Sequence, residues 1–241
     1  MSGPGTGSDR VLERLRRLVE LESPSSDEAR LRAIAGWMSA ELTALGADVD
    51  TVDFAGVGEH VVARVAGSDA SLEPVVVLGH LDTVHGVGSF DPAFRVADGR
   101  ARGPGVYDLK GGWACVLEAL VSLREAGSRP RRPVVLVATC DEETGSETSR
   151  ALIEATARGA RAVLVPEPPL PGGAAKTRRK GVGWYRLEVT GRAAHAGVDP
   201  ENGENALDEL ELQEEEPSRK GDEAGATEVW VGEGGGGGGS D

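Results

Sequence analysis

Histidine and carboxylate side chains follow three apolar segments of the chain. His80 and Asp82 come after the run VVVLG, Glu142 and Glu143 come after VVLVATCD, and Glu167 comes after AVLVP. In open α/β sheets, binding sites lie at the carboxyl ends of the strands. One imidazole together with several carboxylates is a ligand set suited to zinc or a similar divalent ion. The pattern therefore predicts a metal site at one edge of a sheet.

A glycine-rich loop supplies a further carboxylate. The stretch RGPGVYDLKGG places Asp108 directly before a segment with helical periodicity. Asp108 is either a metal ligand or the N-cap of that helix, since aspartate is a favoured N-cap residue. The other candidates also have ordinary explanations: a hydrogen-bonded structural histidine, a solvated acidic pair and a loop carboxylate. Their joint occurrence at three strand ends favours the metal site.

Local spacing assigns different tasks to these side chains. Asp82 lies two residues after His80, and residues two apart in an extended segment point to the same side. Asp82 can therefore accept the second N–H of the imidazole and fix its tautomer. Glu142 and Glu143 are adjacent and point apart, so one carboxylate can bind metal while the other stays free as a base.

Apolar periodicity predicts helices and strands in alternation. Helices are expected over 9–21, from a capping box at Ser25 and Glu28 to Gly46, over 109–126 and over 146–158. Strands are expected over 48–54, 60–66, 75–78, 134–139 and 162–165. The last three are continuously apolar, as central strands covered on both faces are. The predicted fold class is α/β, a three-layer α/β/α domain with a mostly parallel central sheet.

Changes of composition predict four parts. Residues 1–8 are small and polar and are expected to be disordered. An α/β domain fills 9–178, and a smaller α+β domain begins over 179–207, where WYRLEVT alternates as a strand and a helix starts near 202. The acidic, glycine-rich segment 208–241 lacks apolar periodicity and is also expected to be disordered.

The charge of the chain is unevenly distributed. The formal net charge is -14, of which -9 lies in 208–241. The remainder is an ordinary surface charge, which argues against a nucleic-acid partner. Cys115 and Cys140 lie in apolar runs and are expected to be buried free thiols. The N-terminus lacks an apolar signal-peptide core and no apolar run is long enough to span a membrane, so a cytoplasmic location is expected.

Five motifs carry a family resemblance: GHLDTV at 79–84, GVYDLKGG at 105–112, DEETGS at 141–146, EP at 167–168 and AHAG at 194–197. Together they resemble the di-zinc aminoacylase/glutamate carboxypeptidase family. The stretch KTRRKGVGWYRLEVTGRAAHAGVDPENGENAL is most similar to its folate-cleaving glutamate carboxypeptidases. The resemblance implies a zinc-exopeptidase catalytic domain over 9–178 and the start of a dimerisation, or lid, domain over 179–207.

The resemblance also implies a metal ligand set. His80 and Glu167 would hold one zinc ion and Glu143 would hold the other. Asp108 would bridge both ions, and the peptide bond after it would be cis. The family uses two zinc ions in this arrangement.

The resemblance implies catalytic roles for three further residues. Glu142 would be the general base that serves the hydrolytic water, and Asp82 would orient the histidine ligand. His195 would reach the active site of a partner in a homodimer and stabilise the oxyanion. The implied reaction is hydrolysis of an amide bond in a small peptide or N-acyl amino acid, which releases a C-terminal amino acid, glutamate above all.

The chain departs from the family pattern after Leu207. The family's last zinc ligand is a histidine further downstream, and no histidine follows here, while His60 and His85 match no ligand position. We therefore expect a truncated or frame-shifted reading frame that retains one zinc ion. The alternatives are a non-catalytic fragment that binds one zinc, a related N-acyl amino-acid deacylase or dipeptidase, and a sheet protein whose acidic strand ends are only solvated.

Overall fold

The computed structural model describes residues 7–178, 190 and 192. The chain divides into two units, residues 1–175 and 176–241, and the fold below is that of the first unit. His195, the small-domain elements predicted after residue 183 and the tail lie outside the described residues. The four-part division stays a prediction.

Within the described residues, four α-helices form close to the predicted segments. The helix α2 begins at Glu28 because the side chain of Asp27 accepts a hydrogen bond from the Arg30 N–H at 3.1 Å. Asp27 is therefore the N-cap, and the predicted capping box of Ser25 and Glu28 is wrong. The helix bounds are α1 (Gly7–Glu20), α2 (Glu28–Ala44), α3 (Gly111–Glu125) and α4 (Arg150–Ala157). The start of α1 shows that residues 7 and 8 are helical, contrary to the predicted disordered segment.

In the part of the chain that the structure describes, the main sheet has five strands in the order β1-β2-β6-β3-β7. Their bounds are β1 (Asp48–Phe54), β2 (Gly58–Val65), β3 (Val75–His80), β6 (Val134–Thr139) and β7 (Ala162–Leu164). The neighbours β6, β3 and β7 are parallel, whereas β1 pairs with β2 and β2 with β6 in antiparallel fashion. The sheet is thus mixed rather than mostly parallel, because β1 and β2 form a hairpin that joins β6 with the opposite sense.

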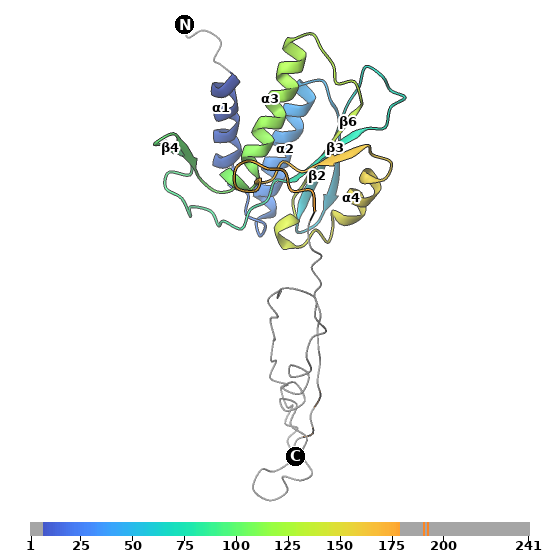
Figure 1. Ribbon diagram of the computed structural model, residues 1–241. Helices are drawn as coiled ribbons and strands as arrows, with labels where there is room; N and C mark the ends of the chain where they lie inside the picture. The colour runs from blue at the N-terminus through green and yellow to red at the C-terminus, as the bar shows by residue number, and fades with distance from the viewer. Residues whose placement is uncertain (1–6, 179–189, 191, 193–241) are drawn as a thin grey trace, which may run out of the picture. The chain divides into compact units, whose positions relative to one another are not determined.

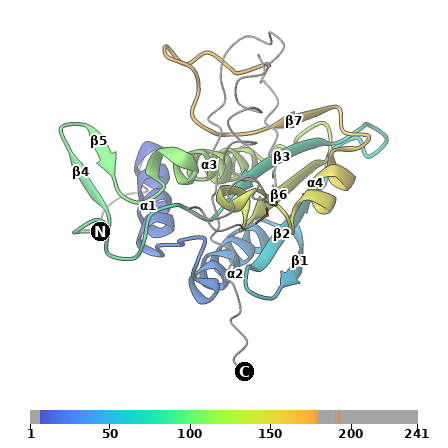
Figure 2. The same cartoon turned by 90° about the horizontal axis from the view of Figure 1, so that it is seen from below.

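Helices lie on both sides of the sheet, as the three-layer prediction requires. The helices α1, α2 and α3 lie on one side and α4 on the other (Figures 1 and 2). Residues that alternate along β2 serve the two faces: Val61 and Ala63 join the core under the first three helices, while Val62 is buried without belonging to that cluster. The main core is completed by Leu18, Leu31, Ile34, Met38, Leu42, Trp113 and Leu117, all fully buried.

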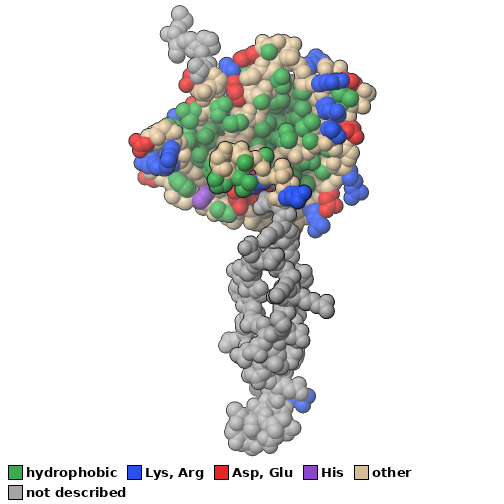
Figure 3. All heavy atoms as spheres, viewed as in Figure 1, with side chains coloured by type: hydrophobic (Ala, Val, Ile, Leu, Met, Phe, Trp, Pro, Cys, Tyr) green, Lys and Arg blue, Asp and Glu red, His purple; other side chains and the backbone are tan. Residues whose placement is uncertain are grey.

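The strand β7 differs from the prediction that it is central. It forms the edge of the described sheet, and all three of its residues are exposed, including Val163 at 41% and Leu164 at 55%. Only β3 and β6 are central among the three apolar strands. Hydrophobic side chains are visible over α3 and beside β7 (Figure 3). Cys115 on α3 is exposed and only Cys140 is buried, so the prediction of two buried thiols is wrong for Cys115.

A small hairpin and a helical turn connect the sheet to α3. The strands β4 (Arg95–Ala97) and β5 (Arg100–Arg102) are antiparallel, joined at the predicted Asp98–Gly99 turn. The chain then passes through the turn η1 (Val106–Lys110) into α3. Within the described residues, no helix has the length and hydropathy needed to cross a membrane.

Candidate metal centre

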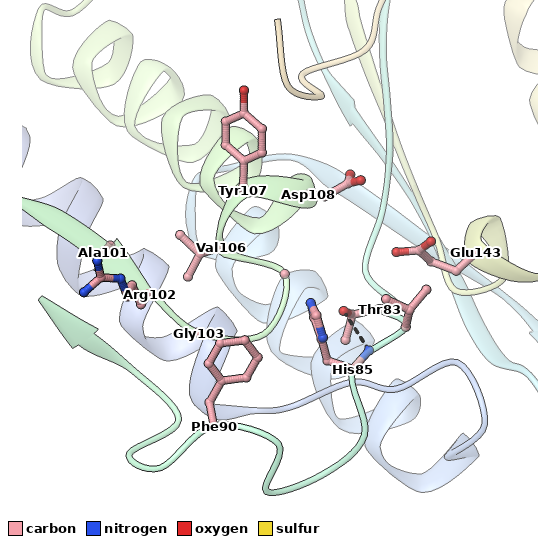
Figure 4. A pocket seen from close by; sticks show the side chains of 12 residues that line it. Thr83, His85, Phe90, Ala101, Arg102, Gly103, Val106, Tyr107, Asp108 and Glu143 are labelled. Carbon is pink, nitrogen blue, oxygen red and sulfur yellow. Dashed lines mark hydrogen bonds between the residues drawn. The ribbon is translucent and has the colours of Figure 1, made fainter.

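Three of the predicted ligands converge at the carboxyl ends of β3 and β6. His80, Asp108 and Glu143 each offer one ligand atom, and these atoms all lie within 4.8 Å of one another. His80 is 2% exposed, whereas the side chain of Asp108 is 57% exposed. Figure 4 shows the Asp108 and Glu143 carboxylates reaching toward the same space. An imidazole and two carboxylates at this spacing suit a divalent metal ion.

The sheet register explains why two of these residues meet. His80 pairs with Thr139 at the ends of the parallel strands β3 and β6. The chain after β6 then turns through a short 3₁₀ helix, Glu142–Thr144, which carries Glu143 back toward His80. The ends of these two parallel strands therefore bring two of the candidate ligands together.

The loop before α3 delivers the third residue. Gly105 has φ 71°, a left-handed conformation that glycine adopts at little cost. A Cβ atom there would lie 3.1 Å from the Asp108 carbonyl oxygen and 3.2 Å from the Lys110 side chain. Asp108 is not the side-chain cap of α3, and the Asp108–Leu109 peptide bond is cis, as the family resemblance implied.

The imidazole of His80 is oriented for a cation. Its Nδ1 lies 3.0 Å from the Asp82 carbonyl oxygen and 3.4 Å from the Asp82 carboxylate. Nδ1 therefore donates, and Nε2 faces Asp108 Oδ1 at 3.3 Å. Two acceptors at that distance repel each other unless a proton or a metal ion lies between them. Burial lowers the pKa of His80, but the hydrogen bond and charge of Asp82 and the charge of Glu142 outweigh it and raise the pKa to about 9.

Asp82 contacts His80 and also fixes the turn that carries Glu142 and Glu143. Its Oδ1 accepts the Glu142 N–H at 3.3 Å, and its Oδ2 accepts the Glu143 N–H at 3.2 Å and the Ser25 hydroxyl at 2.9 Å. The sequence predicts that the carboxylate fixes the imidazole. In the structure the backbone carbonyl is the nearer acceptor, and the carboxylate mainly fixes the following turn.

The carboxylates of the turn are held in an unfavourable electrostatic environment. Partial exclusion of water raises the pKa of Glu142, and the charges of Glu167, Glu143 and Asp82 raise it further, while the charge of His80 opposes them. Exclusion of water, with Asp108 and Asp82, likewise raises the pKa of Glu143. A bound cation would relieve this repulsion, so the donor set fits a metal ion.

Glu167 is not brought into the three-residue group. It follows β7, and its charge reaches Glu142, which places it near the site. Of the four predicted metal ligands, His80, Asp108 and Glu143 therefore share one centre in the described structure and Glu167 lies beside it.

A cavity of about 410 Å³ opens beside the candidate ligands Asp108 and Glu143. His85 and Phe90 line it too, with ring centroids 5.2 Å apart in an edge-to-face arrangement (Figure 4). Sequence analysis missed both residues as parts of a site. They lie in a loop without periodicity, so no pattern marks them as neighbours of the metal ligands.

Lys110 is a third residue that the sequence pattern did not mark as part of a site. It is 1% exposed, and its Nζ has no hydrogen-bond partner among the described residues. Burial lowers the pKa of Lys110 to about 8, against the charges of Glu22 and Asp82. Lys110 follows Asp108 by two residues, and the charge of Asp82 reaches its buried amine.

Two curated proteins are similar to this chain in sequence. Carboxypeptidase G2 from Pseudomonas sp. (strain RS-16) is 36% identical over 201 residues, which cover 82% of this chain and 48% of that protein. Acetylornithine deacetylase from Myxococcus xanthus is 31% identical over 189 residues, covering 76% of this chain and 46% of that one. The chain spans about half the length of these curated relatives.

Solved structures share the fold. Aminopeptidase PepT from Bacillus cereus superposes with a TM-score of 0.61 at 23% sequence identity, over 87% of this chain and 57% of that one. The sequence profile of Peptidase family M20/M25/M40 matches residues 76–228, more than half of the chain. The matched segment begins in β3 and includes all the candidate ligands. The chain therefore belongs to peptidase family M20/M25/M40.

Proposed function

We propose that this chain carries the metal-binding half of a zinc-dependent hydrolase that cleaves an amide bond and releases a C-terminal amino acid, glutamate in the first instance. The convergence of His80, Asp108 and Glu143 beside a cavity of about 410 Å³ carries the proposal. The similarity to carboxypeptidase G2 supports it, since that name denotes release of a carboxyl-terminal residue.

The proposed ligand roles follow the family resemblance. His80 and Glu167 would hold one zinc ion, Glu143 would hold a second, and Asp108 would serve both. The Nε2 atom of His80 faces Asp108, which supports their sharing one ion. When bound, zinc lowers the pKa of its water and polarises the amide carbonyl.

Glu142 is the proposed general base. It takes a proton from the attacking water and later delivers it to the leaving amine nitrogen. Its raised pKa suits a group that must accept and then release a proton near neutral pH. Glu142 belongs to the same turn as Glu143 but not to the ligand group, so it remains free for proton transfer.

The remaining parts of the proposal concern residues and properties beyond the described site. His195, supplied by the partner in a homodimer, stabilises the oxyanion that forms on the amide carbonyl. The substrate is a small peptide or an N-acyl amino acid, and the protein acts in the cytoplasm.

A second candidate function is a non-catalytic domain that binds a single zinc ion. The observation that favours it is the ligand group itself, which contains three residues and leaves Glu167 outside. In that case the zinc content is close to one ion per chain. Hydrolysis stays at background in the parent and in a Glu142 variant alike.

One experiment separates these functions. The full chain is loaded with zinc and dialysed, and its zinc content is measured by mass spectrometry. Hydrolysis of N-benzoyl-glutamate and of N-acetylornithine is then followed by chromatography, with Glu142→Gln as the matched inactive variant. Release of glutamate by the parent chain alone supports the hydrolase. Bound zinc with equal, background hydrolysis in both proteins supports the single-zinc domain, and a folded chain without zinc contradicts both.

A further inference from the structure

A buried polar chain lies beneath the acidic turn that carries Glu142 and Glu143. His60 of β2 is 0% exposed and Asp141 is 3% exposed. Thr148, which precedes α4, stands between them. The proposed mechanism assigns no role to His60, Thr148 or Asp141.

The hydrogen bonds of this chain run in one direction. The Cys140 N–H lies 3.1 Å from His60 Nδ1, and a backbone N–H can only donate, so Nδ1 carries no proton. His60 Nε2 must then carry the proton and donate it to the Thr148 hydroxyl at 2.9 Å. That hydroxyl in turn donates to Asp141 Oδ2 at 2.7 Å. The backbone thus fixes one tautomer of a neutral imidazole.

Asp141 links these hydrogen-bonded side chains to the backbone of the turn. Its Oδ2 also accepts the Thr148 N–H at 2.8 Å and the Ser149 N–H at 3.0 Å. Its carbonyl oxygen accepts the Ser146 N–H at 2.8 Å. The residue before Glu142 is therefore tied to β2, through His60, and to the start of α4.

The turn is tied from its other side by Asp82. The N–H groups of Glu142 and Glu143 both donate to the Asp82 carboxylate. Hydrogen bonds to Asp82 therefore fix the backbone of Glu142 and Glu143 directly. The contacts of Asp141 fix the residue that comes immediately before them. Small movements of this backbone shift carboxylate positions, and functional groups must be held within roughly 0.5 Å of their working geometry.

We propose that His60 and Thr148 are positioning residues that act through Asp141 to hold Glu142 and Glu143 at the metal centre. The inference deepens the proposed function and rests on it where zinc affinity is concerned. The geometric part is independent of zinc, because the tautomer and the backbone contacts exist in the metal-free chain. His60 is thereby distinguished from a histidine that merely fills the core.

The helix α4, which follows Thr148, offers a control for the test. Thr148→Val removes the hydroxyl at nearly constant volume, and Thr148→Ser restores it. Thr156 lies on α4, where its hydroxyl donates to the Leu152 carbonyl at 2.8 Å. Thr156→Val therefore removes a threonine hydroxyl bond from the neighbouring helix without touching the turn. All four proteins are compared as full chains.

Nitrogen-15 NMR of the metal-free chain gives the first readout. The parent should show His60 protonated at Nε2, and Thr148→Val should shift the amide signals of Glu142 and Glu143. Thr148→Ser should restore these signals, and Thr156→Val should leave them in place. A His60 protonated at Nδ1, or equal amide shifts in both valine variants, would overturn the inference whether or not zinc binds.

Zinc affinity, measured by competition with a chromophoric chelator, gives the second readout. Loss of groups that support metal ligands typically weakens binding by about 10–100-fold. Because Thr148 acts one contact further away, we expect a loss near the lower figure, about 10-fold, with recovery in Thr148→Ser. Equal affinity in all variants would refute the positioning role. A parent chain that binds no zinc would contradict the proposed function, while the NMR comparison would still decide the inference.

Discussion

The substitution Asp82→Asn tests how the site is held together. Asp82 is 1% exposed and connects three segments: β3 and its following loop, Ser25 before α2, and the turn after β6. Asparagine keeps the shape of the side chain but replaces one acceptor oxygen with an NH₂ group. The change therefore removes one acceptor and the charge without creating a cavity.

The expected loss of unfolding free energy in Asp82→Asn follows from the three hydrogen bonds that the Asp82 carboxylate accepts. In one orientation the new NH₂ group faces the Glu142 N–H, and in the other it faces the Glu143 N–H, because each carboxylate oxygen accepts one of them. The Ser25 hydroxyl can rotate and accept instead of donating, but a backbone N–H cannot. A buried donor without a partner costs about 1–3 kcal/mol, and bonds to a charged group contribute about 1.5–3 kcal/mol. We expect the free energy of unfolding to fall by about 2–4 kcal/mol.

Urea unfolding of the metal-free chain measures this change, and chelator competition measures the accompanying loss of zinc affinity, expected at about 10–100-fold. Asp50→Asn is the matched control, because Asp50 pairs with Arg64 on the surface and such pairs contribute about 0–1 kcal/mol. Ser25→Ala should give an intermediate loss of about 1 kcal/mol. If Asp82→Asn and Asp50→Asn were indistinguishable in both assays, Asp82 would not hold the turn.

Three further predictions concern catalysis, pH and association. Glu142→Gln should reduce hydrolysis by about 10²–10⁴-fold, as for general acid–base groups, while zinc content stays constant; loss of zinc would make Glu142 a ligand instead. Burial lowers the pKa of His60 despite the charges of Asp141 and Asp82, so below about pH 6.5 the unfolded chain binds a proton that the folded chain does not. The contribution of His60 to the free energy of unfolding should therefore fall by up to about 1.4 kcal/mol for each unit by which the pH is lowered below that value. It is measured as the difference in this free energy between the parent and His60→Gln. If the two proteins showed the same pH dependence, His60 would titrate normally. The exposed apolar strand β7 should promote association at high concentration, and light scattering should show less association for Leu164→Lys than for the parent.

The sequence predicted the elements that carry the centre because their signals are local. The continuous apolar runs of β3 and β6 identify central strands, and the ligands that follow them meet because those strands are parallel. The cis peptide after Asp108 was also expected, from the family resemblance. The boundaries of α1 and α3 differ from the predicted ones by two residues at their starts, because periodicity does not mark where the first hydrogen-bonded turn closes.

Other features depend on contacts between distant residues and left no local pattern. The hairpin β1–β2 pairs with β6 in antiparallel fashion, which the alternation of strands and helices did not indicate. The tautomer of His60 is set by Cys140, which is 80 positions away in the chain. The exposure of β7 reflects its place at the edge of the described sheet, while its apolar sequence is that of a covered strand.

Anomalous scattering at the zinc absorption edge, measured on a zinc-soaked crystal of the full chain, shows whether zinc binds to the proposed ligands. We expect anomalous density at the group formed by His80 Nε2 and the carboxylate oxygens of Asp108 and Glu143, with each of these atoms about 2.0–2.2 Å from a zinc ion. His80→Ala should weaken this density while the fold persists. A zinc ion bound at a different place, or a well-ordered centre without zinc at saturating concentration, would show that these residues are not the metal ligands.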